Sequence, residues 1–239
     1  MSKALTAVAI ALLVWSEVVA QEQQQLLPNI PPPAASFVAR APDPSSWLIT
    51  IKASGNGPAA PFAPPNLPPK YLKQQFWTKA GDKMRCVNDW TDGKRTTDWV
   101  AGAVKFHQSP YGEGLKLFNP SSHPSYHDFS KTDFEMLSWL STDDYVGAVD
   151  YQGEPCYLFR AKRLAPQLDA NPNRRDFTVA DLQAPKSPTS ALISVKTRLP
   201  VAIANGDGQF LYRFQSAPAG ELTMPEPYAS LWKAFNVRR

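Results

Sequence analysis

Apolar and polar side chains alternate in short runs along most of the chain from residue 45 onward, which is the pattern of an antiparallel β-sheet. Residues 45–54, SSWLITIKAS, place Trp47, Ile49 and Ile51 on one face of a first strand. Further runs of strand length lie at 74–79, 84–90, 95–100, 103–108, 115–118, 177–179, 191–195, 199–204 and 209–215. Turn signals such as Asp92-Gly93 separate many of these runs, so we expect neighbouring runs to pair as hairpins.

The segment YVGAVDYQGEPCYLF, residues 145–159, predicts a hairpin with two apolar faces. In its first strand Val149 and Tyr151 share one face, and Val146 and Ala148 share the other. In a strand with one solvent-exposed face, apolar and polar residues alternate, whereas a strand covered on both sides is apolar on both faces. We therefore expect other segments to cover both sides of this hairpin, and Val149 and Tyr151 are candidates for lining a ligand cavity.

The stretch LPVAIANGDGQFLYRF, residues 199–214, predicts a second hairpin around an Asn-Gly-Asp-Gly turn. The turn is open between Asn-Gly, Gly-Asp, Asp-Gly and all four residues, but each choice is a loop of even length. Every choice therefore brings the same aliphatic and aromatic side chains onto one face. The candidates for lining a cavity on this face are Leu199, Val201, Ile203, Phe210, Tyr212 and Phe214.

Two segments carry the spacing of an amphipathic helix. Thr132 and Glu135 match a capping box, and an apolar cluster follows them up to Leu140. Near the C-terminus, Pro227 suits a first helical turn. The apolar stripe behind it consists of Tyr228, Leu231, Trp232 and Phe235. Both helices are expected to seal a face of the sheet.

The first 20 residues have the character of a cleaved signal peptide, with Lys3 ahead of an apolar run that is too short to span a bilayer. Residues 21–36 are rich in Gln and Pro and predict a flexible tether. A single β-rich domain is expected over 37–239, with a long loop at 55–69. The chain is therefore expected to be secreted or periplasmic.

Charge and cysteine content narrow the function classes. The formal net charge is +4, and the basic residues stand in scattered pairs rather than in a stripe, so a nucleic-acid partner is not indicated. Cys86 and Cys156 are the only cysteines. In an oxidising compartment they are a disulfide candidate, and two buried free thiols are the alternative.

Motifs for catalysis or metal binding are not evident. His123 and His127 are four residues apart, but Pro124 and the turn-rich segment around them oppose a regular helix, and no third ligand is apparent. These histidines are interpreted as exposed loop residues. The sequence contains no nucleophile elbow, phosphate-binding loop or dinucleotide fingerprint. We assign no catalytic residue, no metal ligand and no cofactor.

The C-terminal third carries a family likeness in its motifs. Thr197 precedes Leu199-Pro200-Val201, the next strand ends at 212–214 in an aromatic-x-aromatic pattern, and 222–225 form a Leu-x-x-Pro segment. In these features the chain resembles the LolA-like envelope proteins, the periplasmic lipoprotein-carrier superfamily. The resemblance covers about 35 residues, and no position matches a specific functional residue of the carriers.

The resemblance implies an α+β fold: a curved antiparallel sheet, or incomplete barrel, with helices packed in or across its concave face. Such a hollow implies a non-enzymatic protein that binds a hydrophobic ligand or a lipidated partner such as a lipoprotein, as a monomer and at most peripheral to a membrane. A structural or interaction module of the cell envelope with a filled core is the first alternative. A hydrolase or metal-dependent enzyme, based on His123 and His127, is the second.

Overall fold

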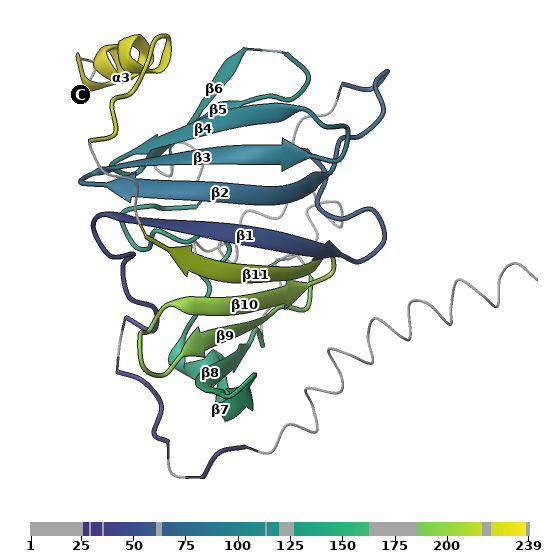
Figure 1. Cartoon of the computed structure of the whole chain (residues 1–239), viewed down its shortest axis with the longest axis vertical. Helices are drawn as coiled ribbons and strands as arrows, with labels where there is room; N and C mark the ends of the chain where they lie inside the picture. The colour runs from purple at the N-terminus through teal and green to yellow at the C-terminus, as the bar shows by residue number, and fades with distance from the viewer. Residues whose placement is uncertain are drawn as a thin grey trace, which may run out of the picture.

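An eleven-stranded antiparallel sheet dominates the computed structural model of the chain (Figure 1). The structure describes residues 26–28, 30–34, 36–60, 64–112, 114–119, 127–162, 185, 187–216 and 221–237. The strands are β1 Ser45–Ala53, β2 Leu72–Ala80, β3 Lys83–Trp90, β4 Arg95–Ala101, β5 Val104–Gln108, β6 Leu115–Phe118, β7 Tyr145–Tyr151, β8 Glu154–Arg160, β9 Ser190–Ser194, β10 Pro200–Asn205 and β11 Gly208–Gln215. Every predicted strand is confirmed except the run at 177–179, which lies outside the described residues.

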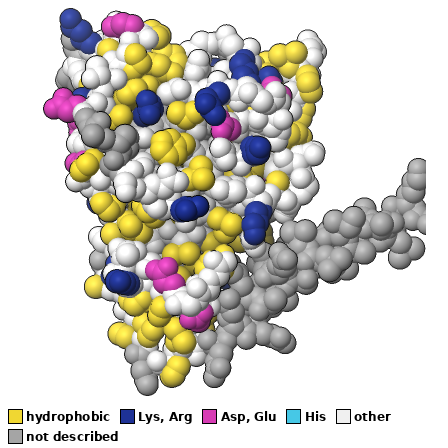
Figure 2. Space-filling view, viewed as in Figure 1, with side chains coloured by type: hydrophobic (Ala, Val, Ile, Leu, Met, Phe, Trp, Pro, Cys, Tyr) yellow, Lys and Arg dark blue, Asp and Glu magenta, His cyan; other side chains and the backbone are white. Residues whose placement is uncertain are grey.

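The strand order is β6-β5-β4-β3-β2-β1-β11-β10-β9-β8-β7. Two meanders, β1 to β6 and β7 to β11, therefore join where β1 pairs with β11, with Trp47 opposite Phe214. The sheet is unclosed, and β6 and β7 form its edges. On the face of the molecule shown in Figure 2, Lys and Arg side chains are spread out rather than gathered into one patch.

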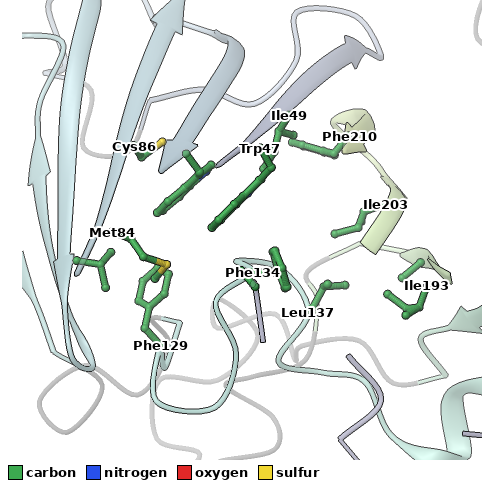
Figure 3. Close-up of a cluster of buried hydrophobic side chains, with 14 of the residues drawn as sticks. Trp47, Ile49, Met84, Cys86, Phe129, Phe134, Leu137, Ile193, Ile203 and Phe210 are labelled. Atoms are coloured by element: carbon green, nitrogen blue, oxygen red, sulfur yellow. The ribbon is translucent and has the colours of Figure 1, made fainter. Parts of the chain in front are cut away.

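Residues 127–141, which we call the plug, lie in the hollow of the sheet. The plug residues Phe129, Phe134 and Leu137 are buried in one core with side chains from β1 to β4 and from β8 to β11 (Figure 3). Strands from both halves of the sheet can meet one short loop only if the sheet curves around it. The face that meets the plug is therefore concave, and the predicted curved, incomplete barrel is confirmed in outline.

The predicted helix over 132–140 is wrong, because the plug consists of turns and bends. The Thr132 hydroxyl accepts a hydrogen bond from the backbone N–H of Phe134, two residues on, rather than capping a helix. Glu135 binds Lys105 of β5 instead of the backbone, and Met136 has a left-handed φ of 70°. Contacts with the sheet thus outweigh local helix propensity.

The C-terminal helix is confirmed as α3, Tyr228–Val237, but it packs against the outer face. Its rings meet aromatic residues of β4 and β5, with centroids 6.2 Å apart for Tyr228 with Trp99 and for Trp232 with Phe106. Strand alternation turns these partners away from the plug. The predicted position of this helix in the concave face is therefore wrong. Within the described ranges, no helix is long and apolar enough to cross a membrane.

The described part of the N-terminal segment, from Leu26 onward, is hydrogen-bonded to the sheet. Leu26 forms a bridge with Val149 of β7, and the N–H of Leu27 donates to the Ala148 carbonyl at 2.8 Å. Further on, the Arg198 guanidinium donates to carbonyls of this segment, among them that of Ala34 at 3.2 Å. The described part of the predicted tether is thus bound to the domain. The predicted signal peptide lies outside the described residues.

The predicted 199–214 hairpin forms with a two-residue Gly206-Asp207 turn, since Asn205 pairs with Gly208. Glycine is required at Gly208, because a Cβ there would lie 2.3 Å from the Lys52 carbonyl oxygen, and its φ is +141°. A β-bulge between Pro200 and Ala202 interrupts the alternation. The expectation that all six aliphatic and aromatic side chains share one face is therefore wrong at Val201, which packs on the outer face.

The disulfide candidate is not formed, because Cys86 and Cys156 are both free and buried. Cys86 belongs to the concave-face core and Cys156 to an outer-face cluster, so the sheet itself separates them. Of the two alternatives left open by the sequence, the structure has the two free thiols.

Both thiols are expected to be unreactive in the native protein. Burial raises the pKa of Cys86 well above its ordinary value and raises that of Cys156 to about 12, so neither forms the nucleophilic thiolate at pH 8. Titration with Ellman's reagent should detect no thiol in the native protein and both in guanidinium chloride without a reductant. Failure to detect them in the denatured protein would mean that they pair after all.

Candidate functional site

The eight predicted cavity-lining side chains are divided between two packed clusters. Five of them lie in the concave-face core with the plug: Leu199, Ile203, Phe210, Tyr212 and Phe214. The other three, Val149, Tyr151 and Val201, lie in the outer-face cluster. None of the eight lines the cavity described next: the plug fills the half of the hollow that the first five face, and the other three lie on the outer face.

A cavity of about 240 Å³ remains at the other half of the hollow, between β2 to β6 and the plug. Its apolar and aromatic lining consists of Pro58, Ala59, Leu72, Trp90, Phe118 and Phe129. Its polar lining consists of Gln75, Asn88, Asp98, Lys105, His107, His127 and Glu135. An apolar wall with a polar group of this kind is typical of a small-molecule site.

Strand alternation places the polar groups. In β4, Asp98 and Val100 point into the hollow while Trp99 points to α3. In β5, Lys105 and His107 likewise flank the outward-facing Phe106. The inner face of two neighbouring strands therefore carries a carboxylate, an ammonium and an imidazole.

Asp98 is the centre of the charged cluster, with only 2% of its side chain exposed. Its carboxylate lies 3.3 Å from the Lys105 ammonium and accepts hydrogen bonds from His107 Nδ1 at 3.0 Å and from the Gln108 N–H at 3.1 Å. Lys105 also donates to Glu135 of the plug at 2.6 Å. The cluster thus connects the sheet floor to the plug across one side of the cavity.

Opposite effects act on the pKa of each charged member. Burial would raise the pKa of Asp98, but the Lys105 charge and the His107 hydrogen bond outweigh it and hold the pKa below its usual range. Burial would lower the pKa of Lys105, but the carboxylates of Glu135 and Asp98 outweigh it and raise the pKa. Both groups are therefore charged at neutral pH, and each neutralises the other.

Two imidazole nitrogens of residues that line the cavity, Nε2 of His107 and Nδ1 of His127, are buried and have no hydrogen-bond partner among the described residues. The Nε2–H of His127 donates to the Thr132 carbonyl at 3.0 Å. The ring also packs edge-on against Phe129, with centroids 4.5 Å apart. His127 is therefore not the exposed loop residue that the sequence indicated, and His123 lies outside the described residues.

The polar side chains that β2 and β3 contribute to the cavity lining are hydrogen-bonded to neighbouring residues. Gln75 Nε2 donates to Asn88 Oδ1 at 2.9 Å, and the Cys86 thiol lies 3.3 Å from the same oxygen. Trp90 Nε1 donates to the Thr96 hydroxyl at 2.9 Å. These bonds hold the Gln75 and Asn88 amides and the Trp90 indole in place, whereas each histidine has one buried ring nitrogen without a hydrogen-bond partner in the described residues.

Sequence reasoning missed this site, although the signal is present. In TTDWVA and VKFHQ, a charged or ionisable residue alternates with a large aromatic residue. The alternation predicts a strand with an aromatic face, which is costly to expose to water, and a charged face, which is costly to bury. Such a pattern indicates that the polar face is enclosed and paired.

Neither a metal site nor a complete nucleophilic triad is assembled within the described ranges. No group of three or more His, Cys, Asp or Glu side chains is placed to hold a metal ion. Asp98 and His107 have the arrangement of a carboxylate and the imidazole that it orients, but no hydroxyl or thiol within those ranges contacts His107 Nε2. The chemistry that the arrangement offers is a hydrogen-bond acceptor fixed in orientation.

The comparisons with known proteins give a distant fold likeness. No protein-family model matches the chain, and no curated protein matches its sequence. Among solved structures, it is similar to a LolA superfamily protein from Nitrosomonas europaea, at 10% identity and a TM-score of 0.31, covering 77% of this chain and 90% of that one. What the site binds must therefore be read from its own residues.

Proposed function

We propose that the protein is an exported, non-enzymatic binding protein that holds a small amphiphilic molecule in the cavity between β2 to β6 and the plug. The observation that carries this proposal is the cavity itself, whose lining combines six apolar or aromatic residues with the buried Asp98 and its partly exposed partners Lys105 and Glu135. An apolar chain would lie against Leu72 and Phe129, and a polar head group would meet the histidines.

The volume limits the size of the ligand. A cavity of about 240 Å³ holds roughly eight non-hydrogen atoms, at the ~30 Å³ that a water molecule occupies in the liquid. A complete long acyl chain of a lipoprotein exceeds this volume while the plug is in place. Short-chain amphiphiles fit it, and the lipidated partner implied by the family likeness would require the plug to move.

Narrowing the cavity should weaken binding. Leu72 lines the cavity, so Leu72→Trp fills part of it, and we expect the affinity for 1-octanol to fall at least about tenfold. The wild-type dissociation constant should be about 10–100 µM, which is ~0.6–0.8 kcal/mol per non-hydrogen atom. Isothermal titration calorimetry on the mature protein measures both values.

The matched control is Leu48→Trp. Leu48 is also a half-buried strand leucine, but it alternates with Trp47 and Ile49 and so faces away from the plug. The Leu48→Trp variant should bind 1-octanol with the same affinity as the wild type. If the wild type shows no heat of binding and no thermal shift with any short-chain amphiphile, the ligand-binding proposal is wrong.

A structural or interaction module is the second candidate function, and one observation favours it. The wall formed by Ile203, Phe210 and Phe214 packs against Phe134 and Leu137 of the plug, so half of the hollow is solid core. Under this function the remaining cavity would bind none of the probes, and the protein would act through its surface.

A further inference from the structure

Resting on the proposed function, we infer that the cavity selects a neutral head group that donates a hydrogen bond, a hydroxyl in the first place, and that His107 and His127 are the acceptors. The hydrogen-bond partner that each ring already has determines which of its two nitrogens is left as an acceptor. A ligand class follows from it: short-chain alcohols rather than carboxylic acids, ethers or amines.

The tautomer of His107 is set by Asp98. An ionised carboxylate can only accept, so the proton on this side of the ring is on Nδ1 and is donated to Asp98 at 3.0 Å. In the neutral imidazole the other nitrogen, Nε2, then carries a lone pair. This Nε2 is buried and has no partner in the described chain, and the residue is only 5% exposed.

His127 also has one ring nitrogen left as an acceptor, but a different partner determines which one. The Thr132 carbonyl can only accept, so Nε2 carries the proton and Nδ1 carries the lone pair. Burial lowers the pKa of this ring, which keeps it neutral at pH 7 and keeps Nδ1 an acceptor. The unused nitrogens of both lining rings are therefore acceptors, and an unpartnered buried acceptor is destabilising until a donor reaches it.

The cavity opposes ionic head groups in two ways. A carboxylate would enter beside Asp98 and Glu135, whose two negative charges exceed the single positive charge of Lys105. An ammonium would lose its hydration on entering the cavity, and both carboxylates already bind the Lys105 ammonium. An ether oxygen or a carbonyl would bring a lone pair against a lone pair. A hydroxyl satisfies an imidazole nitrogen without adding charge.

The test compares two isomers, 1-octanol and 1-methoxyheptane, which have the same volume and differ in whether the head group donates. Calorimetric titration of the mature protein at pH 7.5 should give an octanol affinity at least about tenfold higher than that of the ether. Octanoate and octylamine should also bind at least about tenfold more weakly than octanol. An octylamine affinity equal to or above that of octanol would overturn the preference for a neutral head.

His107→Phe and His127→Phe resolve which acceptor acts. Each should lower the octanol-to-ether affinity ratio, and the ratio should approach one in the variant that lacks the acting acceptor. If one variant does not fold, the wild-type ratio still decides the question. Equal binding of the two isomers by the wild type would overturn the head-group inference and leave the proposed function standing. Binding of neither isomer would overturn the proposed function itself.

Discussion

Replacing Phe134 with alanine is expected to lower the free energy of unfolding by about 3–5 kcal/mol, the range found for large aromatic residues truncated in a core. Phe134 is 1% exposed and lies at the centre of the hollow. Its ring meets Trp47 edge-on at 5.3 Å, and Tyr212 and Phe214 at 6.1 Å and 5.9 Å. These partners come from β1 and β11, where the two meanders join, so the lost ring leaves a cavity that the sheet cannot collapse to fill.

Urea denaturation followed by far-ultraviolet circular dichroism measures this loss. Phe235→Ala is the control, because Phe235 is an aromatic residue of α3 that is only half buried on the outer face. It should cost about 1 kcal/mol. A loss below about 1.5 kcal/mol for Phe134→Ala would mean that the plug is not an integral part of the core.

The strands were predictable because their period of two is a local property of the sequence. Leu115–Phe118 forms β6 at the predicted bounds, and the Gly206-Asp207 turn is one of the options that the sequence left open. The bulge that turns Val201 outward was not predictable, because Pro200 and its partner Ile193 define it across two strands. A shift in register of this kind depends on which residues of the two strands pair, and the pattern of one strand alone does not reveal that pairing.

The plug was mispredicted for the opposite reason, since its local pattern does favour a helix. Helix propensity contributes a few tenths of a kcal/mol per residue. Burying Phe134 and Leu137 contributes about 1.5–3 kcal/mol each, and Glu135 gains an ion pair with Lys105. Tertiary contacts therefore decide the conformation of this segment.

The candidate site depends on the same long-range contacts. Asp98 and His107 lie on neighbouring strands, so their pairing follows from the hairpin. His127 and Glu135 reach the cavity only because the plug folds back into the hollow. A sequence shows which residues could be buried and polar, but not which cavity they share.

Replacing Asp133 with asparagine is expected to lower the free energy of unfolding by about 3 kcal/mol, because it leaves a largely buried ammonium without its counter-charge. Asp133 is only 2% exposed. Its carboxylate accepts from Lys79 Nζ at 2.9 Å and from the Ala41 N–H at 2.8 Å, and it pairs with Arg40 at 3.2 Å. One side chain thereby fastens the plug to β2 and to the N-terminal segment.

The double variant Asp133→Asn, Lys79→Met separates the cost of an unpaired charge from that of lost packing. Removing the buried ammonium as well should restore at least half of the stability, since replacing both partners of a buried pair is often close to neutral. Asp89→Asn is the surface control: its partner Arg95 is mostly exposed, so stability should hardly change. If Asp133→Asn behaves like this control, the plug does not depend on Asp133. If it is destabilising, octanol affinity should fall with it, because Phe129 and Glu135, which line the cavity, belong to the segment that Asp133 holds in place.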